Sequence, residues 1–154
     1  MGGPMPQRGI LTALPAFWPG IGLLARARRA GAVVRRDDLP FETVPGLHRA
    51  RLRAAGGEAW LALPVRAAAP GTPIAEIRLA PTSSFASRAI RAIEHAFGEA
   101  PFFEHHRCDV ARLLFREWPR FAPLAPALTR FLFAAYDVRA EATAATPLRA
   151  GIAG

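Results

Sequence analysis

The chain has 154 residues, 51% of them apolar, and a formal net charge of +8; this suits one folded domain and excludes a disordered tail. All 20 basic residues are arginine, and the absence of lysine excludes Schiff-base catalysis and a Walker-type phosphate lysine. With Cys108 as the one cysteine and no paired histidine spacing, the sequence contains no internal disulfide and no zinc motif.

The first element is an apolar run that is uncharged from Gly9 to Ala25. A targeting segment and the start of a soluble domain are both open interpretations of such a run. Pro15 and Pro19 are four residues apart and would break a single membrane helix. We therefore expect a soluble, cytoplasmic protein that begins with a strand at Ile10–Leu14, a loop, and a helix at Ile21–Ala30.

The next elements are strands. Residues 31–36 form the second expected strand, so the chain opens with a β-loop-α-β unit whose strands should be parallel. A hairpin is expected from Arg49–Arg53 and Ala59–Leu63, with the turn at Gly56 and Gly57. An alternating pattern predicts a further strand at residues 74–80.

The second half of the chain is predicted to be helical. Apolar residues at helical spacing indicate helices at about residues 83–97, 107–118 and 124–136. The sequence thus predicts an α/β fold, in which a β-loop-α-β unit with a mixed sheet and a β-hairpin precedes three C-terminal helices. We expect one domain over residues 1–139 and a flexible tail over residues 140–154.

A first candidate site lies between the opening strand and helix. Amide groups at Gly20 and Gly22 could hold a phosphate at the helix N-terminus, with Phe17 against the substrate. In the alternative interpretation, the glycines only permit a tight turn and Phe17 belongs to the core.

A second group of candidates follows the second strand. Asp37 and Asp38 are candidate catalytic residues that could bind Mg²⁺ or a sugar hydroxyl at the carboxyl end of the sheet. Alternatively, they are surface carboxylates paired with Arg35 or Arg36.

The predicted hairpin carries a third group. Arg49 and Arg51 are two residues apart on a strand and therefore share a face, which Arg53 continues, and their guanidinium groups suit phosphate or carboxylate. A solvated strand face explains the same pattern. His48 is a candidate acid or base, or a structural residue. No sequence motif indicates a particular cofactor or metal.

Five short motifs occur in a distinctive order: PAFWPGIG at residues 15–22, DDLPF at 37–41, HRARL at 48–52, WLALPV at 60–65 and APFFEHH at 100–106. In this order they resemble the WbqC-like family, bacterial proteins often found with surface-polysaccharide genes. Several polar positions of the family's motifs are changed here, namely Ala13, Leu14, Pro40, His48 and Ala50, and Gly20 stands where the family has a tryptophan. The resemblance implies a divergent, C-terminally short member.

Two functions follow from the resemblance and the candidate residues. The protein is either a transferase for a nucleotide-linked or activated substrate in surface-polysaccharide or related biosynthesis, or an inactive member that binds an anionic ligand or a protein partner. The charge of +8 favours an anionic small molecule, although coding bias accounts for it equally well. Neither a membrane nor nucleic acid is expected as a partner, because acids and arginines are interspersed and no recognition motif occurs. The oligomeric state is left open.

Overall fold

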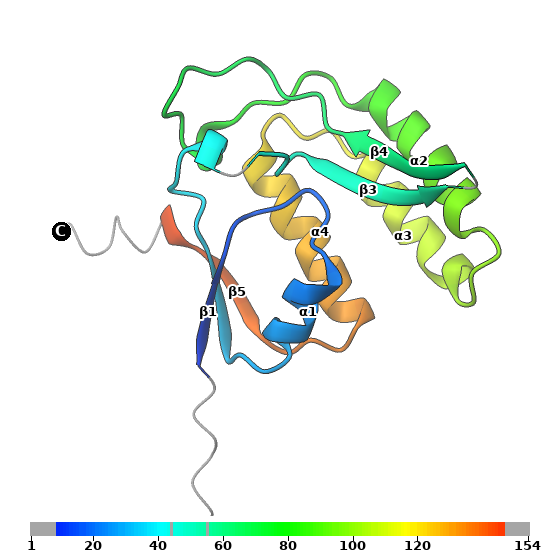
Figure 1. The fold of residues 1–154 in the computed structure, drawn as a ribbon, viewed down its shortest axis with the longest axis horizontal. Coiled ribbons are helices and arrows are strands. Elements are labelled where there is room, and N and C mark those ends of the chain that lie inside the picture. The colour runs from blue at the N-terminus through cyan, green and yellow to red at the C-terminus, as the bar shows by residue number, and fades with distance from the viewer. Residues whose placement is uncertain (1–8, 44, 55, 147–154) are drawn as a thin grey trace, which may run out of the picture.

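A computed structural model describes residues 9–43, 45–54 and 56–146 (Figure 1). A parallel sheet contains β1 (Ile10–Ala13), β2 (Ala32–Arg35) and β5 (Glu141–Ala144) in the order β1-β2-β5. Helix α1 (Ile21–Ala27) connects β1 to β2, which confirms the predicted β-loop-α-β opening. This helix ends three residues before the predicted end, because its last turn tightens into hydrogen bonds between residues three apart.

The hairpin is a separate antiparallel sheet of β3 (Arg49–Ala54) and β4 (Gly57–Ala62). Gly57 has a φ of +125°, a backbone conformation that side chains disfavour, and this explains the glycine at the start of β4. Side chains alternate along β3 as predicted, with Ala50 and Leu52 buried. The α/β class, the hairpin and the C-terminal helices are therefore confirmed, with parallel and antiparallel pairs in two different sheets.

Three longer helices make up the second half: α2 (Ser83–Phe97), α3 (Phe103–Phe115) and α4 (Phe121–Ala135). Helix α2 matches the prediction. Helix α4 begins earlier than predicted because Pro123 falls in its first turn, where a missing N–H is tolerated. Among the described residues, no helix is both long and apolar enough to cross a membrane.

Helix α4 packs between the two sheets (Figure 1). On one side, Leu124 and Leu128 join a core with the hairpin, α2 and α3. On the other, Leu132 and Phe133 pack with α1 and with Val33 of the parallel sheet. Because α4 belongs to both cores, it fixes the position of the hairpin relative to the parallel sheet.

The strand predicted at residues 74–80 is wrong in its first half, where the chain forms the 3-10 turn η2 (Ile74–Glu76). Ile74 and Ile77 are both fully buried at a spacing of three, which suits such a turn better than a strand. After it, Leu79 and Arg78 make isolated bridges to Val65 and Arg120. A second 3-10 turn, η1 (Phe41–Thr43), lies in the loop after β2.

The predicted tail from residue 140 is contradicted at residues 141–144, which form β5 and pair in parallel with β2. Val138 and Ala140 are buried next to α4 and direct the chain back to the sheet. Small side chains with weak periodicity can still complete a sheet when a partner strand is present. Residues 147–154 lie outside the described part of the chain.

Candidate ligand-binding site

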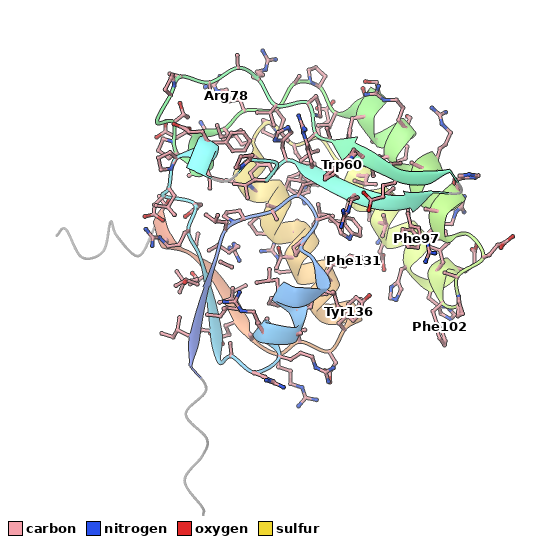
Figure 2. The ribbon with its side chains drawn as sticks, viewed as in Figure 1. Trp60, Arg78, Phe97, Phe102, Phe131 and Tyr136 are labelled. Carbon is pink, nitrogen blue, oxygen red and sulfur yellow. The ribbon has the colours of Figure 1, made fainter. Side chains whose placement is uncertain are left out.

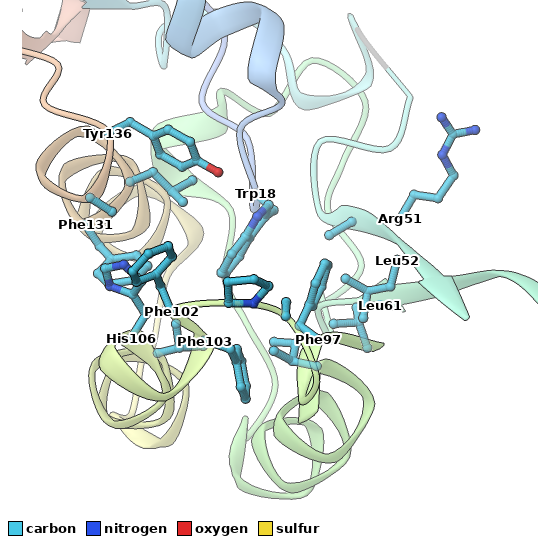
Figure 3. Close-up of a pocket in the computed structure, with 17 residues that line it drawn as sticks. Trp18, Arg51, Leu52, Leu61, Phe97, Phe102, Phe103, His106, Phe131 and Tyr136 are labelled. Atoms are coloured by element: carbon cyan, nitrogen blue, oxygen red, sulfur yellow. The ribbon is translucent and has the colours of Figure 1, made fainter. Parts of the chain in front are cut away.

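A groove of about 530 Å³ is the candidate ligand-binding cavity of the described structure (Figure 3). It lies between the hairpin, the turn from α2 to α3, and the C-terminal end of α4. Its size is in the usual range for small-molecule sites. Six aromatic residues line it, and we call it the aromatic groove: Trp18, Phe97, Phe102, Phe103, Phe131 and Tyr136.

The turn between α2 and α3 forms one wall of the aromatic groove. Phe102 has a left-handed φ of 68° and an exposed fraction of 74%, both unusual for a bulky apolar residue. Strained backbone of this kind is concentrated at functional sites. The opposite wall is apolar, with Leu52 and Leu61 directed inward from the hairpin (Figure 3).

Four side chains supply polar groups around the aromatic groove: Trp18, His106, Tyr136 and Arg51. The His106 ring packs edge-on against Phe131, with ring centroids 5.8 Å apart. The Arg51 guanidinium points away from the groove (Figure 3) and forms an ion pair with Glu58 at 3.0 Å. Since both partners are exposed, this pair is weak and an anionic ligand can displace it.

Among the predicted site residues, only Arg51 lines the aromatic groove. Phe17 is instead a core residue with an exposed fraction of 1%, and its ring packs edge-on against Phe85 at 5.6 Å. This burial favours the alternative interpretation, in which Phe17 belongs to the core. Phe17 lies in the loop after Pro15, where the sequence pattern alone does not distinguish a core residue from a residue that contacts a ligand.

The glycines of the first candidate site lie outside the groove lining as well. Gly20 precedes α1, and its carbonyl accepts hydrogen bonds from the amides of Leu23 and Leu24. An alanine side chain at Gly20 or Gly22 would meet no atom within 4 Å. Neither a close approach of other groups nor a positive φ thus requires glycine at these positions.

The two aspartates are engaged within the chain. Asp37 is buried, and its Oδ1 accepts hydrogen bonds from the amides of Ala145 at 3.1 Å and Thr146 at 3.0 Å, and from the Thr146 hydroxyl at 3.0 Å. Asp38 accepts two hydrogen bonds from the Arg36 guanidinium, at 2.8 and 3.0 Å. These carboxylates hold the chain after β2 and β5, and they lie outside the lining of the aromatic groove.

His48 packs against Phe41, with ring centroids 5.6 Å apart. Its Nε2 accepts a hydrogen bond of 3.3 Å from Arg49, while its buried Nδ1 has no hydrogen-bond partner among the described residues. Burial, together with the nearby charge of Arg49, lowers the pKa of His48 below its ordinary value. The ring is therefore held neutral, as in a structural histidine.

The lowered pKa of His48 predicts a pH dependence of stability. Between its folded pKa and about 6.5, the unfolded chain binds more protons at this residue, so the free energy of unfolding should fall as the pH drops through that window. Chemical denaturation from about pH 7.5 to 5.5 should show a smaller fall for His48→Gln than for the wild type. The exposed control His95→Gln should retain the wild-type profile.

Within the described ranges, no three His, Cys, Asp or Glu side chains are grouped so that they could hold a metal ion. The groups on the aromatic groove are instead rings, one imidazole, one phenol hydroxyl and one arginine at the edge. This arrangement can stack a planar or ring-shaped group and place an anionic group next to Arg51.

The sequence interpretation missed the groove because its walls come from segments far apart in the chain. Phe97 and Phe131 fit the helical spacing of apolar residues, a pattern that is typical of core positions and does not indicate a groove. The signal that could have located the groove was the consecutive aromatic pair Phe102 and Phe103 in a turn, where large apolar side chains have little core to enter.

Comparison with known proteins gives one match. A family model, described as the WbqC-like protein family, matches residues 15–151. No curated protein and no solved structure matches the chain significantly.

Proposed function

Because the chain belongs to the WbqC-like protein family, whose model covers nearly all of it, we propose that it binds a nucleotide-linked or otherwise activated substrate in the aromatic groove. The observation that carries this proposal is the convergence of motifs. The groove lining includes Trp18 of the opening motif, Arg51 of the basic motif, Leu61 of the strand motif and Phe102 of the turn motif. Four of the five family-like motifs thus contribute to one cavity.

The residues that line the groove favour a ligand with a ring-shaped group at one end and a phosphate at the other. A base or sugar ring can stack on Trp18 or Phe102, since large aromatic faces attract planar and apolar ring surfaces. A phosphate that extends beyond the groove would meet the Arg51 guanidinium, which points away from the groove and forms an exposed ion pair with Glu58. An uncharged apolar ligand would make no use of Arg51.

The geometry favours binding over catalysis as the function. Asp37 and Asp38 carry hydrogen bonds within the chain, and His48 lies outside the groove lining. The transferase hypothesis stays as the second candidate because His106 lines the groove and has the chemistry of a general acid or base. In that case His106→Gln should keep ligand affinity and abolish product formation.

Thermal shift with a panel of nucleotides and nucleotide-sugars tests the proposal. A ligand at about 100 times its Kd adds roughly 2.7 kcal/mol and raises Tm by several degrees. We expect Phe102→Ala and Arg51→Lys to lose most of this shift, because they remove a stacking face and a bidentate donor. Phe115→Ala, at an exposed aromatic on α3, is the matched control. The proposal is overturned when no such ligand raises Tm, or when Phe102→Ala and Phe115→Ala respond equally.

A further inference from the structure

The solvent-facing side of the hairpin is a second surface with distinct chemistry, and Arg51 is the residue that it shares with the lining of the aromatic groove. The register pairs Arg49 with Ala62, Arg51 with Trp60, and Arg53 with Glu58. All six side chains are exposed, whereas those between them on β3 are buried. We call these six residues the hairpin outer face.

Trp60 is the most unusual member of this face, with an exposed fraction of 62% (Figure 2). The other two tryptophans are partly or almost fully buried, and the Trp118 indole donates a hydrogen bond to the Leu113 carbonyl. The Trp60 indole therefore presents a free aromatic surface directly across the hairpin from Arg51.

The hairpin outer face is also positively charged, with three arginines and one glutamate. Glu58 pairs with Arg51, and within the described residues no carboxylate lies within 4 Å of the Arg49 or Arg53 guanidinium. Arg49 and Arg53 are four residues apart on β3, a distance of about 13 Å. This spacing is comparable to that of two phosphates that are two nucleotides apart along an extended nucleic-acid strand, and each guanidinium fork fits a phosphate.

We propose that the hairpin outer face binds single-stranded nucleic acid, with a base stacked on Trp60 and phosphates on Arg49 and Arg53. A free indole beside spaced arginines suits a single strand, because a base can stack on the indole and the charged phosphates of the backbone can pair with the arginines. A duplex hides its ring faces, and an acidic peptide has carboxylates but no ring to stack. The sequence predicted no nucleic-acid partner, because acids and arginines are interspersed along it and no recognition motif occurs. The strand register adds Trp60 to the face that the three arginines share.

Fluorescence anisotropy of the full chain with a labelled single-stranded oligothymidylate tests this proposal. Loss of one stacked base should weaken binding of Trp60→Ala by about 5- to 150-fold. Arg49→Gln and Arg53→Gln should each reduce the slope of log K against log salt by about 0.7. The matched controls are Phe115→Ala for an exposed aromatic and Arg88→Gln for an exposed arginine, and both should bind like the wild type.

Other outcomes overturn the proposal. Unchanged binding by Trp60→Ala would mean general electrostatic attraction, and equal Trp60-dependent binding of heparin would mean an acidic glycan site. The Phe102→Ala variant of the aromatic groove should keep wild-type oligonucleotide affinity. Failure of nucleotide-sugar binding with intact oligonucleotide binding would therefore reject the groove function alone, and the reverse result would reject the hairpin proposal alone.

Discussion

Replacing Phe17 by alanine is expected to lower the free energy of unfolding by about 3–5 kcal/mol, as for a phenylalanine removed from a packed core. The ring has an exposed fraction of 1% and packs edge-on against Phe85 and Trp18, with centroids 5.6 and 6.4 Å away. The backbone amide of Phe17 also donates to the Leu47 carbonyl at 2.8 Å. Removal of the ring would leave a cavity where the opening loop meets the hairpin core.

Urea denaturation measures this change, with Phe115→Ala as the control. Phe115 is a phenylalanine of the same size with an exposed fraction of 52%, so its replacement should cost less than about 1 kcal/mol. A Phe17→Ala protein of wild-type stability that had lost ligand binding would contradict the structure. It would instead support the substrate-binding role predicted from the sequence.

Replacing Asp37 by alanine is expected to lower the free energy of unfolding by about 3 kcal/mol, because it leaves the buried amide of Ala145 and the partly buried donors of Thr146 without an acceptor. One carboxylate oxygen of Asp37 accepts hydrogen bonds from the amides of Ala145 and Thr146 and from the Thr146 hydroxyl, at 3.0 to 3.1 Å. These bonds connect the end of β2 to the chain directly after β5. Their loss should release β5 from the sheet edge, which hydrogen exchange at Thr143 would detect.

The control for Asp37→Ala is Asp109→Ala, which removes an exposed carboxylate paired with Arg112 on the surface of α3. Its effect should be less than about 1 kcal/mol. The loss of unfolding free energy for Asp37→Asn should lie between those of the two alanine variants, since an amide oxygen still accepts hydrogen bonds but carries no charge. Unchanged stability in Asp37→Ala, together with lost ligand or metal binding, would restore the catalytic assignment of Asp37.

Both predictions concern residues whose chemistry suits a ligand site but whose contacts in the structure stabilise the fold. Phe17 lies in the core and Asp37 is bound to the C-terminal segment, so the proposed ligand recognition rests on lining residues of the aromatic groove such as Phe102 and Arg51. Variants of Phe17 and Asp37 should therefore change the free energy of unfolding, while variants of Phe102 and Arg51 should change the affinity for the ligand. The contrast between the two pairs separates the folding role of each motif from its binding role.

Local sequence was sufficient for the elements whose patterns are contained within a few residues. The spacing of Phe85, Ala89 and Ile93 predicts α2, and Gly57 with the alternation along Arg49–Arg53 predicts the hairpin. The prolines at 15 and 19 indicate the loop between β1 and α1. The ordered motifs also resembled the family that the chain belongs to. Each of these signals depends on neighbouring residues and on backbone preferences that operate before the chain is packed.

Only the tertiary structure decided where the distant segments meet. Strand β5 has a weak pattern and exists because β2 offers it a partner, and Asp37 is structural because Thr146, 109 residues later, lies beside it. The aromatic groove and the hairpin outer face likewise depend on packing and register, which bring Trp18 to Phe102 and Arg51 to Trp60. Burial and pairing between remote residues determine these roles, and the spacing of residues along a single chain does not contain that information.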